Sequence, residues 1–241
     1  MPTFAPDSYG VYGEVSILPV SAISAYPERL SFAEGTSIWA QYLTAWGGLV
    51  HFGHLRQGDT VLITAASSST GVAAIQTVKA EGGVSIATTR TAAKRQELLA
   101  LGADHVIVAD EEDLVSRVME ITGGRGARLI YDPVGGNSLE TLVQAAAKSA
   151  TIIEYGLLAT EPTVLPLFAA LVKYLTIKAY DVHEIFALPE QMNAAKEYIL
   201  RRLEDGSYTP RIARTFPLAE IVEAHRYMKS NAHLGNIIVT V

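Results

Sequence analysis

The sequence predicts an α/β fold built around a doubly wound parallel β-sheet, and three observations lead to this prediction. Short runs of β-branched and apolar residues alternate with longer helical patterns through the middle of the chain. Alternation of this kind indicates crossover units and a parallel sheet with helices on both faces. The runs are almost wholly apolar, which is typical of strands that are buried on both sides. With 241 residues, of which 49% are hydrophobic, the chain is long enough to bury a large core.

The expected strands and helices follow one another along the chain. Strands are expected at Val61–Thr64, Val84–Thr88, Val106–Val108, Leu129–Tyr131, Thr151–Tyr155 and Thr176–Tyr180. Helices are expected at Gly71–Glu81, Ala92–Leu101, Glu112–Thr122, Ser138–Ala147 and Pro189–Asp205. Glycine follows several of these helices directly, as it does where a helix ends in a left-handed residue.

Both ends of the chain depart from this alternation. Tyr9–Pro19 is expected to be an extended piece that leads into Pro27. Ile212–Phe216, Leu218–Lys229 and Asn236–Val241 are expected to form a strand, a helix and a strand. These ends are therefore expected to belong to another layer outside the main sheet.

Composition and charge exclude several classes of protein. The chain has 19 basic and 25 acidic residues, a formal charge of −6, which argues against nucleic acid as the main partner because phosphate backbones need a basic surface. It contains no cysteine, which excludes disulfides, thiol nucleophiles and thiolate metal sites. Met1–Gly10 lacks the apolar run of a signal peptide, and the uncharged stretch Gly35–Leu55 contains polar residues and glycines that favour a buried helix over a membrane span. The sequence thus predicts a cytoplasmic protein without a membrane partner.

The segment Val61–Ala74 is the most informative part of the chain. It predicts a strand, a turn of small residues and the N-terminus of a helix, where free N–H groups and the helix dipole can hold a pyrophosphate. The glycine fingerprint of dinucleotide-binding proteins falls on Ala66, Ser68 and Gly71, so that only its last glycine is present. The alternative interpretation is a turn of small residues that serves only close packing.

The end of the next expected strand favours a phosphorylated ribose. NAD-binding folds carry an acidic residue there, about 20 residues after the turn, for the ribose hydroxyls. Here Thr88–Thr91 is followed by Lys94 and Arg95, and no acid is present. Hydroxyl and basic groups suit a 2′-phosphate, and basic residues at a helix start oppose the helix dipole unless an anion compensates for them. NADPH is therefore the expected cofactor, and a solvated helix start is the alternative.

Several ordered blocks give the chain a specific resemblance. They are Gln41–Trp46, Leu55–Ile63, Gly71–Gln76, Leu101–Ile107, Glu120–Gly124, Tyr131–Gly136 and Gly235–Val241. In this order and spacing, the blocks resemble the medium-chain dehydrogenase/reductase superfamily and, within it, the zinc-independent quinone oxidoreductase-like branch. The resemblance covers nearly the whole chain and implies a Rossmann domain.

The resemblance also implies roles for individual residues. Thr44 matches the threonine that approaches the nicotinamide, and Ser68, Ser69, Thr70 and Gly71 match the pyrophosphate turn. Positions matching the adenosine-phosphate site are Thr89, Arg90 and Lys94, and those matching the nicotinamide surroundings are Tyr155, Gly156, Leu157, Ala179 and Tyr180. Leu175–Tyr180 matches the strand that pairs the sheets of two subunits in the family dimer.

The chain departs from the family pattern at its ends. Members of the family begin with a catalytic domain of GroES-like fold, and Tyr9–Val15 resembles only the last strand of that domain. The resemblance therefore implies a truncated member, with residues 1–35 as a remnant of the GroES-like domain, 36–206 as the dinucleotide-binding domain and 207–241 as the return to that remnant. A fragment of a longer protein is the trivial alternative.

No metal site is expected. Ala40 stands at the position that matches a zinc ligand of the family, and a catalytic zinc needs about three protein ligands. The six histidines, His51, His54, His105, His183, His225 and His233, show no spacing typical of ligands.

The sequence offers only aromatic candidates for a proton donor. Tyr42, Trp46, Tyr155 and Tyr180 lie near the expected cofactor loops, and for each the alternative is a packed core aromatic. Tyr42 is the first choice as a catalytic residue because it lies two residues before Thr44.

The expected function is an NADPH-dependent, zinc-independent oxidoreductase that reduces a quinone or an α,β-unsaturated carbonyl by hydride transfer. The alternative is a family member without redox activity, either a non-redox biosynthetic enzyme or a binding or structural dimer that uses the old cofactor crevice. Because loss of a packed domain exposes apolar surface, a homodimer or higher homo-oligomer is also expected.

Overall fold

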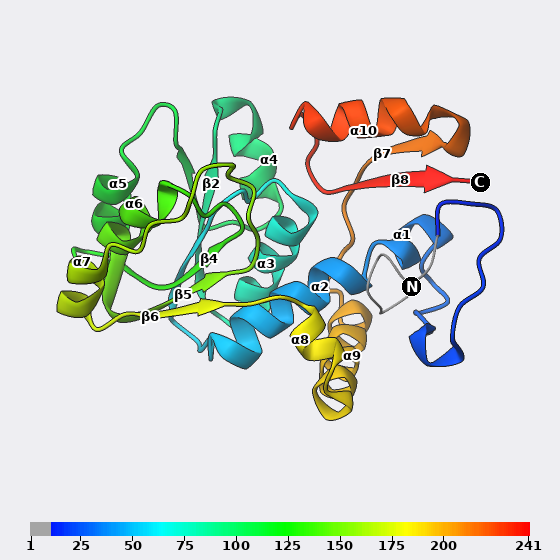
Figure 1. Cartoon of the computed structure of the whole chain (residues 1–241), viewed down its shortest axis with the longest axis horizontal. Helices are drawn as coiled ribbons and strands as arrows, with labels where there is room; N and C mark the ends of the chain where they lie inside the picture. Colours follow the sequence, from blue (N-terminus) through cyan, green and yellow to red (C-terminus); the bar gives the residue numbers. More distant parts are fainter. Residues whose placement is uncertain (1–10) are drawn as a thin grey trace.

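A sheet of six parallel strands forms the centre of the computed structural model, which describes residues 11–241 (Figure 1). The strand order is β3-β2-β1-β4-β5-β6. The strands are β1 Thr60–Ile63, β2 Val84–Thr89, β3 His105–Val108, β4 Ala127–Asp132, β5 Ala146–Glu154 and β6 Thr176–Ala179. The predicted doubly wound α/β class is confirmed, and this strand order is that of the dinucleotide-binding folds.

Helices cover both faces of the sheet and bury two separate apolar clusters. The helices between β1 and β6 are α3 Ser69–Ala80, η3 Ala92–Lys94, α4 Arg95–Ala100, α5 Leu114–Ile121, α6 Ser138–Ala145 and α7 Leu167–Lys173. The others in residues 11–210 are η1 Val20–Ala22, α1 Phe32–Thr36, α2 Trp39–Ala45, the π-helix η2 Trp46–Phe52, α8 His183–Phe186 and α9 Pro189–Glu204. Side chains of α2, α3 and α9 pack on one face of the sheet, and side chains of α5 and α6 pack on the other.

The uncharged stretch Gly35–Leu55 packs against the sheet as buried helix, as the sequence predicted. Two of its glycines make the approach possible. A Cβ on Gly48 would lie 2.5 Å from Cε2 of Tyr131, and a Cβ on Gly47 would overlap the hydroxyl of Tyr180. Among the helices of residues 11–241, none combines the length and the apolar character needed to cross a membrane.

The main difference from the predicted elements lies between α6 and β5. The expected helix Ser138–Ala147 ends at Ala145, and Ala146 already pairs with Ala127 of β4. Alanine is a strong helix former, so the run Ala145–Ala147 predicts that the helix continues, whereas a distant residue contacts the end of α6. Lys173 Nζ of α7 donates to the carbonyls of Val143, Gln144 and Ala146, at 3.0, 2.7 and 2.8 Å. The short helices α1, α7 and α8 were not predicted either.

A second, two-stranded sheet lies to one side of the main body (Figure 1). It consists of β7 Ile212–Pro217 and β8 Asn236–Thr240, which are parallel and joined by η4 Leu218–Glu220 and α10 Ile221–Lys229. The predicted strand, helix and strand of the tail are thus confirmed. Residues 11–19 form neither helix nor strand, and Met1–Gly10, including the start of the expected extended piece at Tyr9, lies outside the described residues. The domain boundaries at residues 35 and 206 stay a prediction.

Candidate functional site

A cleft of about 1090 Å³ opens at the carboxyl ends of β1, β2 and β4. In the sheet, β1 lies between β2 and β4, so the crossovers diverge to opposite sides at this point. Parallel α/β sheets place their ligands at such a point because the loops on either side leave room there. The residues that line the cleft from the strand ends include Thr64, Ala65, Ser67, Thr88, Thr89, Arg90, Thr91 and Asp132.

The turn between β1 and α3 forms one wall of the cleft. Ser68 caps α3, and its Oγ accepts a hydrogen bond from the amide of Gly71 at 3.0 Å. The amides of Ser69 and Thr70 lie in the same first turn, where helical geometry provides no acceptor for them. The predicted pyrophosphate turn is therefore a helix N-terminus with donors still available for an anion.

Gly71 has a structural reason to be glycine. A Cβ at this position would lie 2.6 Å from the Cα and carbonyl oxygen of Ala66, which are backbone atoms of the preceding turn. The helix can therefore approach the end of β1 only because the side chain is absent. This is the close helix–strand packing that the last glycine of the fingerprint provides.

Hydroxyl groups and one free guanidinium line the cleft at the end of β2. Thr88 and Thr89 end β2 and are buried, and Thr89 Oγ1 donates to the carbonyl of Thr91 at 3.3 Å. Arg90 follows them, lines the cleft and is exposed. Within residues 11–241 its guanidinium has no hydrogen bond or ion pair, so it is free to meet an anionic ligand.

Lys94 also lines the cleft, but its ammonium group is already engaged. Nζ donates to Ser67 Oγ at 2.9 Å, to the carbonyl of Asn231 at 2.6 Å and to the carbonyl of His233 at 2.7 Å. Burial, and then the neighbouring charge of Arg90, lowers the pKa of Lys94. Arg90 and Lys94 thus both line the cleft, but only the Lys94 side chain is already hydrogen-bonded.

None of the residues predicted for the nicotinamide end is among those that line the cleft. The ring of Tyr155 stacks on Tyr131 with centroids 3.9 Å apart. Burial, and then the negative charge of Asp132, raises the pKa of Tyr155, whereas the neighbouring Ser68 side chain acts in the opposite direction. Tyr155 therefore lies next to Ser68 of the predicted pyrophosphate turn. The sequence could not show that these two residues are neighbours.

The other predicted residues of this end are spread over three elements. Gly156 packs closely on Pro133, and Leu157 is 72% exposed. Ala179 ends β6, and the buried hydroxyl of Tyr180 donates to the carbonyl of Leu43 at 3.4 Å. The Thr44 hydroxyl donates to the carbonyl of Ala40 in its own helix at 2.7 Å.

Tyr42 is held in the core. It is 1% exposed, its ring stacks on Tyr208 with centroids 4.1 Å apart, and its hydroxyl donates to Gln76 Oε1 at 2.7 Å. Gln76 in turn bonds both the amide and the carbonyl of Thr209 at 3.0 Å, so the hydroxyl belongs to a buried network between α2, α3 and the tail. Burial raises the pKa of Tyr42. The role of Tyr42 as a proton donor stays a prediction. To donate a proton to a substrate, its hydroxyl would have to leave this hydrogen-bond network.

A pair of carboxyl groups at the cleft was missed at the level of sequence. Asp132 ends β4, lines the cleft and is fully buried, and its register partner in β5 is Glu154. Asp132 accepts hydrogen bonds from the Thr64 hydroxyl and from the amides of Val134 and Gly135, the last two at 3.1 and 2.8 Å.

Glu154 lies beside Asp132, and few polar groups are present to stabilise its charged form. Burial, then the charge of Asp132 and a hydrogen bond to it, raises the pKa of Glu154 to about 8. Its Oε1 is buried without a hydrogen-bond partner among the described residues. The available signal was that Asp132 directly follows the predicted strand Leu129–Tyr131 and that Glu154 lies near the end of the predicted strand Thr151–Tyr155. The sequence did not show that these two strands are neighbours.

A second contribution that was missed comes from the tail. Ser230, Asn231 and Ala232 line the cleft although they lie after α10. The amide of Gly235 donates to the carbonyl of Ser67 at 3.0 Å, which fastens this loop to the turn after β1.

Residues 11–241 contain no group of three or more histidine, cysteine, aspartate or glutamate side chains that could hold a metal ion. The histidines are dispersed: His51 stacks on Trp46, and His183 contacts Asp181. This donor set does not fit a catalytic zinc.

Comparison with known proteins gives a consistent picture. A family profile described as zinc-binding dehydrogenase matches residues 69–197, more than half of the chain. A crystal structure of an NAD-dependent alcohol dehydrogenase is 31% identical, with a TM-score of 0.87 over 96% of this chain and 65% of that one. Quinone oxidoreductase of Escherichia coli, solved in complex with NADPH, is 26% identical, with a TM-score of 0.88 over 95% of this chain and 71% of that one.

A much longer protein also contains a related segment. A component of the phenolphthiocerol/phthiocerol polyketide synthase of Mycobacterium tuberculosis is 28% identical over 99% of this chain. The chain spans only 11% of the length of that synthase component.

Proposed function

Because the chain belongs to the zinc-binding dehydrogenase family, and within the medium-chain dehydrogenase/reductase superfamily is quinone oxidoreductase-like, we propose that it is an NADPH-dependent oxidoreductase. Its substrate in this proposal is a quinone or an α,β-unsaturated carbonyl compound, which accepts a hydride at carbon or oxygen. A relative supports this class of reaction: quinone oxidoreductase 1 of Escherichia coli is 26% identical over 98% of this chain. A cytoplasmic location stays a prediction from the sequence.

The observation that carries the proposal is the free Arg90, which lines the same cleft as Ser67 of the turn that leads into α3. The volume of about 1090 Å³ is at the upper end of the range for ligand sites. The first turn of α3 offers amides for a pyrophosphate, and the hydroxyls of Thr88 and Thr89 offer partners for a ribose. These residues fit an adenosine dinucleotide, and Arg90 fits an additional 2′-phosphate.

Bound NADPH supplies the hydride, and the protein supplies binding, orientation and electrostatics. The amides of Ser69 and Thr70 would hold the pyrophosphate. Arg90 would hold the ribose phosphate. Tyr155, which lies against Ser68 and is half-buried, would keep water away from the turn. The residues do not fit a zinc ion, so no step is assigned to a metal.

Replacing Arg90 by glutamine tests the proposal. Wild-type protein is expected to bind NADPH about 30-fold more tightly than NADH, because a charge-assisted, bidentate contact contributes about 2 kcal/mol. The R90Q variant is expected to lose this preference while its affinity for NADH stays within about twofold. Isothermal titration calorimetry of both proteins with both cofactors measures the effect.

The matched control is Arg56→Gln, which removes an exposed arginine that does not line the cleft. R56Q is expected to keep the preference for NADPH. If wild-type protein binds neither cofactor, the proposal is wrong, and the cleft takes a non-redox ligand.

We also propose that the protein is a homodimer, on the basis of an exposed apolar face at the edge of the sheet. Within residues 11–241, strand β6 pairs with β5 alone, so its other edge has no partner strand in this part of the chain. Beside it, α7 exposes Leu167, Phe168, Leu171 and Val172, with Phe168 80% exposed. Contiguous apolar surface of this kind marks an interaction site, and an open strand edge is a template for pairing.

Light scattering is expected to give twice the subunit mass of 25.9 kDa at micromolar concentration. Phe168→Asp is expected to raise the dimer dissociation constant by about 100-fold, since it places a charge in the apolar contact. The control Phe32→Asp changes an equally exposed phenylalanine in α1 and is expected to leave the dimer intact. A monomeric wild-type protein would contradict the proposal.

A further inference from the structure

The turn after β4 and the loop after β5 lie together at the cleft. The turn is residues 133–136, and the loop is residues 156–166. The amide of Leu158 donates to the carbonyl of Pro133 at 3.0 Å, and the next amide of the loop donates to the carbonyl of Val134 at 2.9 Å. Val134 and Leu158 both line the cleft. The turn and the loop therefore form one part of its wall.

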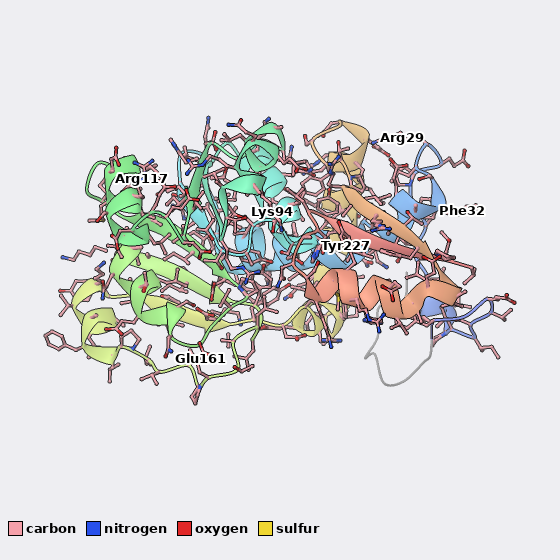
Figure 2. All side chains as sticks on the ribbon, turned by 90° about the horizontal axis from the view of Figure 1, so that it is seen from above. Arg29, Phe32, Lys94, Arg117, Glu161 and Tyr227 are labelled. Carbon is pink, nitrogen blue, oxygen red and sulfur yellow. The ribbon has the colours of Figure 1, made fainter. Side chains whose placement is uncertain are left out.

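A third hydrogen bond joins the turn to the outer part of the loop. The amide of Gly136 donates to Thr163 Oγ1 at 2.8 Å. Figure 2 shows Glu161 of this loop at the outer edge of the molecule. Most residues of the loop are exposed, so its attachment to the body of the protein depends on the turn.

Asp132 fixes the start of the turn. One of its carboxylate oxygens accepts hydrogen bonds from the amides of Val134 and Gly135, at 3.1 and 2.8 Å, and the other accepts one from the Thr64 hydroxyl. The side chain is fully buried. An aspartate that accepts from the amides following it stabilises a turn. The position of the turn, and of the loop bonded to it, thus depends on Asp132.

Glu154 presents a second carboxyl group to Asp132. The two residues are register partners in β4 and β5, and the side chains two positions earlier, Ile130 and Ile152, both belong to the apolar cluster on the α5 and α6 face of the sheet. Glu154 forms a side-chain hydrogen bond with Asp132. Since carboxylates only accept hydrogen bonds, this bond exists only while one of the two groups carries a proton.

The neighbouring strand β6 provides no cation for this pair. The register partner of Glu154 in β6 is Ala179, which does not titrate. Lys178 precedes it and therefore points to the opposite face of the sheet, where its ammonium pairs with Glu184. Tyr155 also lies on that face, in the other apolar cluster.

The helices on the face of the pair leave it without a counter-ion among the described residues. Their charged residues are exposed or bonded elsewhere: Arg117 and Glu120 of α5, Glu140 of α6 and Lys173 of α7. Burial, and then the charge of Asp132, accordingly raises the pKa of Glu154 to about 8.

We propose that Glu154 is a pH-sensitive positioning residue for this wall of the cleft. With its proton, Glu154 donates to Asp132, and the Asp132 carboxylate holds the turn 133–136 and, through it, the loop 156–166. When the proton passes to water, the wall opens more often. The inference concerns the free protein and needs neither cofactor nor substrate.

Loss of the proton places two negative charges side by side at a buried site. The hydrogen bond between Glu154 and Asp132 is then lost, and Glu154 Oε1, which is buried without a partner among the described residues, has to be hydrated. The loop begins two residues after Glu154, so water reaches this oxygen when the loop moves aside. Because the loop is bonded to the turn, the turn moves with it.

Amide hydrogen exchange of the free wild-type protein, corrected for the intrinsic exchange rate at each pH, tests the proposal. Protection of the Gly135 and Leu158 amides is expected to fall by about tenfold from pH 6 to pH 8 and to level off above about pH 9, because the open form releases the proton that the closed form retains. The amide of Val72, which bonds the carbonyl of Ser68 in another wall of the cleft, is the internal control and is expected to show no such fall.

Glu154→Gln separates the proton from the shape of the side chain, since its amide group can donate to Asp132 at every pH. In E154Q, protection of both amides is expected to match the wild type at pH 6 and to keep that value at pH 8. The matched control Glu161→Gln removes an exposed carboxylate from the same loop and is expected to keep the pH dependence of the wild type.

Two results would overturn the inference. One is wild-type protection that does not change between pH 6 and pH 8. The other is a fall of equal size in E154Q, which would mean that Glu154 only fills space. If E154Q does not fold, the ¹³C signal of the Glu154 carboxyl in the wild type decides: titration near pH 8 supports the inference, and titration near the ordinary pKa of 4.5 overturns it. A failure to bind NADPH would contradict the proposed function and would leave these results unaffected.

Discussion

Replacing Gly71 by alanine is expected to lower the free energy of unfolding by about 3 kcal/mol, because overpacking of this kind forces backbone atoms apart. The new Cβ would lie 2.6 Å from the Cα and carbonyl oxygen of Ala66, and backbone cannot swing away as a side-chain end can. Helix α3 must then move away from the end of β1. In a chain of this size the melting temperature is expected to fall by about 6 to 12 °C, which differential scanning calorimetry measures.

Gly13→Ala provides the matched control for the general effect of adding a methyl group to a glycine. The nearest atom to a Cβ at Gly13 is the carbonyl oxygen of Val15 at 3.8 Å, which is ordinary contact. This variant is expected to melt within about 1 °C of the wild type, as surface changes generally do. Equal melting temperatures for Gly71→Ala and the wild type would show that α3 does not need its close approach to β1.

The second large effect is expected at Glu154. Because the pKa of Glu154 is raised to about 8 by burial and by Asp132, the folded protein binds its proton more tightly than the unfolded chain does. The stability from this group is complete below about pH 4.5 and is lost as the pH rises to about 8. Glu154→Gln keeps the shape and the neutral state, so it is expected to be more stable than the wild type by about 2 kcal/mol at pH 9, a value reduced for the solvent around this half-buried side chain.

Urea unfolding of the wild type and E154Q at pH 5, 7 and 9 measures this difference, which is expected to grow with pH and to be small at pH 5. Glu197→Gln, on the exposed face of α9, is the control and is expected to show no such growth. A constant difference between wild type and E154Q across this range would mean that folding does not raise the pKa of Glu154.

Much of the fold could be predicted because its signals are local. The apolar runs of β1 to β6 and the glycines that follow several helices each depend on a few neighbouring residues, and the predicted strands all appear within one or two residues of their expected ends, apart from the early start of β5. The junction of α6 and β5 was predicted less well because its alanines favour a helix, while Lys173, about thirty residues away, bonds the last carbonyls of α6.

The candidate site, too, could be predicted only where its signals are local. Residues 68–71 and Arg90 were identified from the sequence, because a strand followed by a helix start and the residues at the next strand end have fixed places in a parallel sheet. The bonding state of Lys94, the pairing of Asp132 with Glu154 and the network around Tyr42 could not be read in this way. Each depends on which distant segments meet: Lys94 and Asn231 are 137 positions apart, and Tyr42 and Gln76 are 34 apart.

The sequence by itself therefore determined the class of fold, the order of its elements and the position of the turn that is expected to hold a phosphate, since periodicity, apolar runs and turn residues act over short distances. Only the tertiary structure decided which of two neighbouring cations is free, which carboxyl group is forced to keep its proton, and which loop closes the cleft. Those properties arise from burial and from hydrogen bonds between segments that the fold brings together, and no local pattern specifies them.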